Sequence, residues 1–140
     1  AHVLATQTLM QRKPKSMRLR IDGEPAFGVT PKDLILAAIA RFGAAVGSDH
    51  AIEYAGTAVD AMDIEGRLTL CNLSVEMGAK FGFVAADART LAYVDGRPFA
   101  PRGADFEQAA AQWASLHSDA GARFDRELQL SADDVAPTVT

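Results

Sequence analysis

Hydrophobic and polar residues follow two different spacings in the first third of the chain. Residues 17–23 alternate apolar and charged side chains, which is typical of a half-buried strand that ends at a turn. Residues 34–42 place apolar side chains at helical spacing instead. Thr30 and Pro31 suit the cap and the first position of this helix, and Gly43 suits its end. The pattern predicts a strand followed by a capped helix.

The rest of the chain continues this alternation of strand and helix patterns. Residues 51–54 and 124–130 are predicted strands, and residues 81–85 are a strand or an extended connection. Helical patterns cover residues 1–10, 57–62, 64–80, 87–95 and 106–118. We expect one α/β domain over residues 1–130, in which helices cover a mostly parallel sheet. Residues 131–140 are polar and predict a flexible C-terminal tail.

Composition narrows the class of protein. The chain has 140 residues, of which 49% are hydrophobic and 23% charged, the balance of a globular protein. The net charge of −4 implies no basic face, so we expect no nucleic-acid partner. Apolar runs are broken by charges well short of a membrane span, and the start lacks the pattern of a signal peptide. These features predict a cytoplasmic protein with no membrane partner.

Few residues offer metal or redox chemistry. Cys71 is the only cysteine, so no internal disulfide forms. Iron–sulfur clusters normally use three or four cysteine ligands, which this chain does not contain. On the apolar side of a predicted helix, Cys71 is either a reactive thiol or lone ligand, or a small buried hydrophobic residue, and the second interpretation is favoured. His2, His50 and His117 show no ligand spacing.

Asn72 and Glu76 lie four residues apart in the predicted helix 64–80 and would point the same way. A carboxylate beside an amide, between Gly66 and Gly78, suits an active site that another backbone or a ligand approaches closely. The same spacing also describes the polar stripe of an amphipathic helix. From spacing alone, the polar stripe is the favoured interpretation, and the active site is the alternative.

The cluster Ser48-Asp49-His50 suggests a hydrolase that uses Asp49 and His50. Catalytic triads, however, are assembled by the fold and seldom sit consecutively in sequence. A loop that leads into the strand at residue 51 is the simpler interpretation. A stand-alone interaction domain without catalysis is a further alternative.

Five ordered segments resemble bacterial isopropylmalate isomerase large subunits, a branch of the aconitase family. The most distinctive reads Gly-Arg-Leu-Thr-Leu-Cys-Asn-Leu-Ser-Val-Glu-Met-Gly-Ala-Lys, residues 66–80. It is similar to the family's Gly-Arg-x-Thr-x-Cys-Asn-Met-Ser-Ile-Glu-x-Gly-Ala. The other matching segments are His-Val-Leu-Ala-Thr-Gln-Thr-Leu at 2–9, Gly-Val-Thr-Pro-Lys-Asp-Leu-Ile-Leu at 28–36, Ile-Glu-Tyr-Ala-Gly at 52–56 and Val-Asp-Gly-Arg-Pro-Phe-Ala-Pro at 94–101.

The resemblance implies a layered α/β/α domain of the aconitase iron–sulfur type, truncated, with a mostly parallel sheet. It implies a hydro-lyase that interconverts 2-isopropylmalate and 3-isopropylmalate in leucine biosynthesis by dehydration and rehydration. The complete subunit of this family carries a [4Fe-4S] cluster as Lewis acid and pairs with a separate small subunit. A homoaconitase-type or methylmalate-type isomerase is the alternative within the family.

The resemblance also assigns roles to single residues. It makes Glu76 the catalytic carboxylate where the substrate hydroxyl meets iron, places Asn72 beside the cluster, and implies that Cys71 is not a ligand. The family's cluster-ligand motifs and its Asp-Ser-His-Thr motif do not occur in this sequence. We therefore expect a fragment of the large subunit that binds no metal or cluster by itself and does not turn over substrate.

Overall fold

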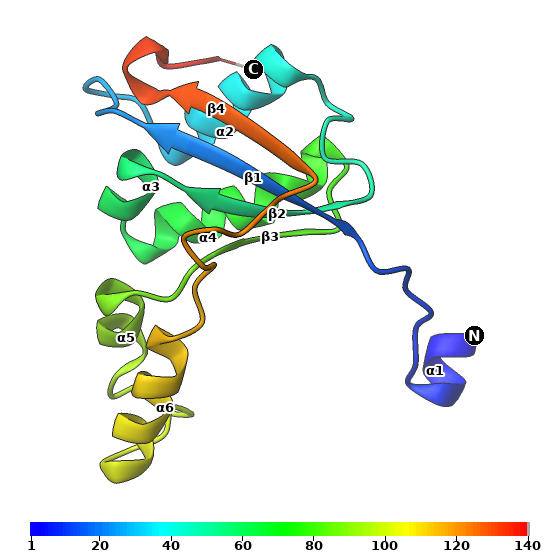
Figure 1. Cartoon of the computed structure of the whole chain (residues 1–140), viewed down its shortest axis with the longest axis vertical. Helices are drawn as coiled ribbons and strands as arrows, with labels where there is room; N and C mark the ends of the chain where they lie inside the picture. Colours follow the sequence, from blue (N-terminus) through cyan, green and yellow to red (C-terminus); the bar gives the residue numbers. More distant parts are fainter. Residues whose placement is uncertain (140) are drawn as a thin grey trace.

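A four-stranded parallel sheet is the centre of the computed structural model, which describes residues 1–139 (Figure 1). The strands lie in the order β3-β2-β1-β4, and every neighbouring pair is parallel. The prediction of a mostly parallel sheet is therefore confirmed. The strands are β1 (Lys15–Asp22), β2 (His50–Ala55), β3 (Phe81–Val84) and β4 (Arg126–Ser131).

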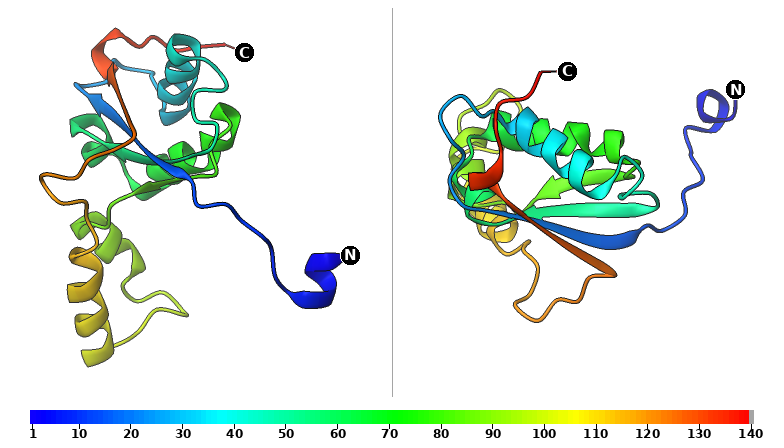
Figure 2. Two further views of the ribbon diagram at one scale, coloured as in Figure 1. Left: turned by 45° about the vertical axis from the view of Figure 1, so that its right-hand side comes forward. Right: turned by 90° about the horizontal axis from the view of Figure 1, so that it is seen from above.

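Helices α2 and α4 lie on the same face of the sheet (Figure 2, right). Helices α5 and α6 lie together beyond one end of the sheet, and α1 projects away from the rest (Figures 1 and 2). No helix within residues 1–139 has the length and apolar character needed to cross a bilayer. The helices are α1 (His2–Thr6), α2 (Pro31–Phe42), α3 (Thr57–Ala61), α4 (Ile64–Leu73), α5 (Ala88–Val94) and α6 (Ala104–Ala114), with 3₁₀ turns η1 (Ser74–Met77) and η2 (Ala132–Asp134).

The core lies between the sheet and the helices α2 and α4. Strand β1 turns its alternate residues Met17, Leu19 and Ile21 to this side, and all three are fully buried. Helix α2 buries Leu34 and Ile35 against them. Burial of each such side chain contributes about 1.5–3 kcal/mol, so this one-sided core supplies most of the stability.

The opposite face of the sheet is largely polar and is crossed by the segment that leads into β4. On this face the Phe124 ring lies 4.6 Å from the Arg18 guanidinium, and Ser118 Oγ donates to the Glu53 carboxylate at 2.5 Å. Phe81 and Phe83 remain 53% and 40% exposed. Residues 1–139 thus form a helical layer on one face, and the second helical layer of an α/β/α arrangement is not among them.

The helix predicted over residues 64–80 is shorter than expected. It ends at Leu73 and continues as the 3₁₀ turn η1, which stops where Gly78 takes a left-handed φ of 74°. Helical spacing groups Leu68 and Val75 with Cys71 on one apolar side of this helix, but Leu68 and Val75 are 48% and 66% exposed. The residues that α4 and η1 bury are instead Gly66, Arg67, Leu70, Ser74 and Met77.

Both ends of the chain differ from their predictions. Only His2–Thr6 of the predicted helix 1–10 is helical. The expectation of an unstructured end from residue 131 is wrong for residues 131–135, because Ala132 and Val135 are buried in the core. Further along, the Thr138 N–H donates to the Asp33 carboxylate at 2.7 Å. Two apolar side chains thus pack this otherwise polar segment against the core. Flexibility of the residues after 135 stays a prediction.

Gly82 lies where β3 passes under α4, and a larger residue there should destabilise the fold. A Cβ at this position would overlap the Ser74 hydroxyl and lie 2.8 Å from Cε2 of the Tyr54 ring. We expect Gly82→Ala to lower the free energy of unfolding by about 1–3 kcal/mol, the usual cost of overpacking a core. Urea unfolding followed by circular dichroism measures this change.

The matched control is Gly121→Ala, because nothing lies within 4 Å of a Cβ at that position. This variant should unfold at the same urea concentration as the unchanged chain. Equal stability of the two variants would contradict the close packing of β3 against α4.

Candidate functional site

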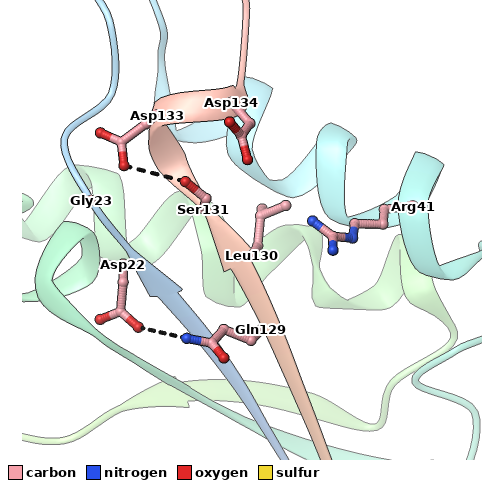
Figure 3. A pocket seen from close by; sticks show the side chains of 8 residues that line it. All are labelled: Asp22, Gly23, Arg41, Gln129, Leu130, Ser131, Asp133 and Asp134. Carbon is pink, nitrogen blue, oxygen red and sulfur yellow. Dashed lines mark hydrogen bonds between the residues drawn. The ribbon is translucent and has the colours of Figure 1, made fainter.

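A polar hollow of about 340 Å³ lies where β1 and β4 end (Figure 3). The carboxyl ends of parallel strands are the usual place for a ligand site in α/β folds. The lining residues are Asp22, Gly23, Arg41, Gln129, Leu130, Ser131, Asp133 and Asp134.

Two carboxylates of this hollow are already used to tie the chain together. Asp22 accepts hydrogen bonds from Arg20 Nε at 2.7 Å, the Thr57 N–H at 3.1 Å and Gln129 Nε2 at 3.4 Å. The bond from Arg20 is the main reason why the pKa of Asp22 lies below its ordinary value. Asp133 accepts from the Glu24 N–H at 3.0 Å. The carboxylates of the hollow therefore stabilise turns of the chain. Within residues 1–139, no group of three or more Asp, Glu, His or Cys side chains is placed to bind a metal ion.

The residues that the sequence singled out, Asn72 and Glu76, lie at the other edge of the sheet. Helix α4 and η1 return from the carboxyl end of β2 to the start of β3, so their last residues meet the amino ends of the strands. Both side chains are exposed, and neither has a hydrogen-bond partner within residues 1–139. They belong to different types of helix, since Asn72 is in the α-helix α4 and Glu76 is in the 3₁₀ turn η1. The fold thus presents an amide and a carboxylate to the outside.

Backbone hydrogen bonds hold the turn that carries Glu76. The Gly78 N–H donates to Val75 O at 2.9 Å, and the Ala79 N–H donates to Ser74 O at 3.2 Å. The loop before β2 adds a third bond, from the Gly47 N–H to Met77 O at 2.8 Å. The position of Glu76 in space is therefore fixed from both sides of the turn.

Cys71 is half-buried and packs against the hydrophobic core. Its burial raises the pKa of the thiol above the ordinary value. A protonated thiol is a poor nucleophile and metal ligand, which supports its interpretation as an apolar packing residue.

The cluster Ser48-Asp49-His50 does not form a triad. His50 Nδ1 lies 2.7 Å from the backbone oxygen of Ser48, not from its hydroxyl. Asp49 has a left-handed φ of 62°, as a residue in a tight turn does, and its carbonyl accepts the Lys15 N–H. These contacts fit the simpler interpretation of a loop that leads into β2.

Residue spacing does not predict the ion pair between the buried Arg67 of α4 and Asp87, whose side chain is 39% exposed at the start of α5. Arg67 Nη2 donates to the Asp87 carboxylate at 2.7 Å and to Asp60 O at 3.0 Å. The Arg67 side chain is only 5% exposed, and its Nε and Nη1 have no partner within residues 1–139. The same Asp87 caps α5 by accepting the Thr90 N–H at 3.0 Å. The hydrogen bond from Arg67 is the main reason why the pKa of Asp87 falls far below its ordinary value.

The chain is an α/β domain with a parallel sheet, a class of fold found in many metabolic enzymes, and it carries an exposed amide and carboxylate. Residues 1–140 match the aconitase family (aconitate hydratase), and the chain belongs to this family. It is 55% identical over 139 residues to 3-isopropylmalate dehydratase large subunit 1 of Bradyrhizobium diazoefficiens, covering 99% of this chain and 29% of that protein. It is 51% identical over 139 residues to the 3-isopropylmalate dehydratase large subunit of Azotobacter vinelandii, covering 99% of this chain and 30% of that protein. The chain therefore spans about three-tenths of the length of these relatives.

The Arg67–Asp87 pair predicts unequal effects of removing either partner. Asp87→Ala leaves a buried guanidinium without its counter-ion and should lower the free energy of unfolding at neutral pH by about 2 kcal/mol. Arg67→Met replaces the cation by an apolar side chain of similar length and should cost less. Urea unfolding of both variants measures the difference, and a larger loss for Arg67→Met would contradict the assignment.

The same pair predicts how stability depends on pH. The folded-state pKa of Asp87 is lowered, so its stabilising effect is complete above the carboxyl's unfolded pKa and is lost as pH falls toward the folded value. Below about pH 4, the unchanged chain should therefore lose stability more steeply than Asp87→Asn. Parallel acid-limb curves for the two proteins, followed by circular dichroism, would contradict this.

Proposed function

We propose that this chain forms part of the large subunit of a 3-isopropylmalate dehydratase. The reaction is the interconversion of 2-isopropylmalate and 3-isopropylmalate in leucine biosynthesis by loss and return of water. The observation that carries the proposal is the identity above 50% over nearly the whole chain with two large subunits of that name. The geometry supports it, since the segment with the strongest resemblance presents two free polar groups.

Glu76 is the residue proposed to act as the catalytic carboxylate, at the substrate hydroxyl. A general acid or base must reach the proton that it transfers, and an exposed carboxylate without a partner within residues 1–139 meets this condition. Asn72 lies one turn before it and offers both a donor and an acceptor for orienting a bound group. Cys71, between the core and this surface, contributes packing.

The family resemblance implies a [4Fe-4S] cluster in the complete subunit. The residues of this chain do not fit a set of cluster ligands, because it has one thiol, half-buried and with a raised pKa. Cluster ligands and the small subunit would therefore be supplied from outside these 140 residues. We infer that the chain alone does not turn over substrate and that the parent enzyme is cytoplasmic.

A chimeric enzyme tests the proposal. The chain replaces the matching region of the Bradyrhizobium large subunit 1, and the product is co-expressed with the small subunit of that enzyme and purified anaerobically. Ultraviolet absorbance of the unsaturated dehydration product gives the rate. The unchanged chimera should be active, and Glu76→Gln should lower kcat by about 10²–10⁴-fold, the usual contribution of a general acid or base.

Glu65→Gln is the control, since Glu65 is also exposed but lies in the first turn of α4, at the other edge of the sheet. It should leave kcat unchanged. An inactive chimera that nevertheless carries its cluster would contradict the proposed reaction, and full activity of Glu76→Gln would contradict the role of Glu76.

A further inference from the structure

Two hydroxyl groups meet in the core directly beneath the turn that carries Glu76. Tyr54 of β2 is 1% exposed, Ser74 at the start of η1 is fully buried, and their hydroxyl oxygens lie 2.7 Å apart. The Ser74 hydroxyl also donates to Leu70 O at 3.0 Å. Since Ser74 has one hydroxyl hydrogen, Tyr54 is the donor of the bond between them.

This contact lies where the backbone changes from α-helix to 3₁₀-helix. The Ser74 N–H donates to Cys71 O, three residues back, and the Ser74 side chain occupies the Leu70 carbonyl that an α-helix would give to this N–H. Each 3₁₀ residue turns the chain about 20° further than an α-helical residue does. The direction of Glu76, two residues on, therefore depends on where this change occurs.

The Tyr54 ring is enclosed in the core and lies against the backbone of β3. Gly82 of β3 lies against both groups, so closely that a Cβ on it would overlap the Ser74 hydroxyl and lie 2.8 Å from the Tyr54 ring. A buried hydroxyl that loses its partner normally recovers a hydrogen bond by moving or by admitting water. Because Tyr54 is part of β2 and packs against β3, loss of its hydrogen-bond partner should displace the turn η1 rather than the ring.

We propose that Tyr54, Ser74 and Gly82 form a seat for η1 and act as positioning residues that set the direction of Glu76. The role of the seat in catalysis rests on the function proposed for Glu76. The seat itself is a property of the fold. It works as a unit, because a matched pair of apolar side chains would fill the same space without leaving a polar group unpaired.

The first experiment measures amide hydrogen exchange by NMR in the 140-residue chain. In Ser74→Ala the Tyr54 hydroxyl is left without a partner, so exchange of the Gly78 and Ala79 amides, which close η1, should accelerate about tenfold or more. Exchange of amides in the middle of α2 serves as the reference for overall stability and should change less. In the double variant Tyr54→Phe/Ser74→Ala, protection of Gly78 and Ala79 should return to within about twofold of the unchanged chain.

Unchanged exchange at Gly78 and Ala79 in Ser74→Ala would overturn the seat. An equal acceleration at α2 would do the same, because it would show only a general loss of stability. A double variant as labile as Ser74→Ala would show that the two hydroxyl groups do not act as a unit and would also overturn it.

The second experiment places the same variants in the chimeric enzyme. Ser74→Ala should lower kcat about tenfold with the KM for 3-isopropylmalate little changed, since Glu76 is displaced while other substrate contacts remain. Tyr54→Phe/Ser74→Ala should recover most of the kcat. If Glu76→Gln abolishes turnover but Ser74→Ala does not lower kcat, the positioning role is wrong. If Glu76→Gln leaves turnover intact, the function proposed for Glu76 is wrong. The hydrogen-exchange results then still test whether Tyr54, Ser74 and Gly82 position η1.

Discussion

The packing of α4 and η1 on the inner face of β2 and β3 is the interaction on which the rest of the structure depends. Strand β3 has only four residues and one strand neighbour, so its place in the sheet relies on the layer above it. Gly82 allows this close approach, and the side chains of Tyr54 and Ser74 lie against it. The ion pair between the buried Arg67 and the partly exposed Asp87 extends the same layer to α5.

This packing also explains at which end of the strands polar side chains remain without hydrogen-bond partners. At the carboxyl ends of the strands, Asp22 and Asp133 are committed to holding turns together. At the amino ends, the return of α4 leaves Asn72 and Glu76 exposed without partners within residues 1–139. The site proposed for Asn72 and Glu76 is thus at the end of the sheet opposite to the one that parallel sheets usually use for ligands.

The sequence predicted the elements well where local chemistry is strong. Thr30, Pro31 and Gly43 bound α2 as expected, and Thr30 and Asp33 form a complete capping box. The period-2 pattern identified β1 because its two faces differ sharply in polarity. The prediction for residues 64–80 failed because helical period alone does not reveal a change to 3₁₀-helix, although Gly78 marked its end.

Tertiary contacts account for what the sequence did not predict. Arg67 looks like a surface charge until α5 brings Asp87 to it, and no spacing rule joins residues 20 apart. Ala132 and Val135 are too few to give a pattern, yet both reach the core. For Asn72 and Glu76, spacing favoured the polar stripe of an amphipathic helix, and only the family resemblance favoured an active site.

The close packing of Tyr54, Ser74 and Gly82 can be measured directly. Nuclear Overhauser spectroscopy of the unchanged 140-residue chain measures it without any substitution. We expect strong cross-peaks from the Tyr54 ε protons to the Gly82 α protons and to the Ser74 β protons. Absence of both, with the cross-peaks between β1 and β2 intact, would contradict the packing that places Glu76.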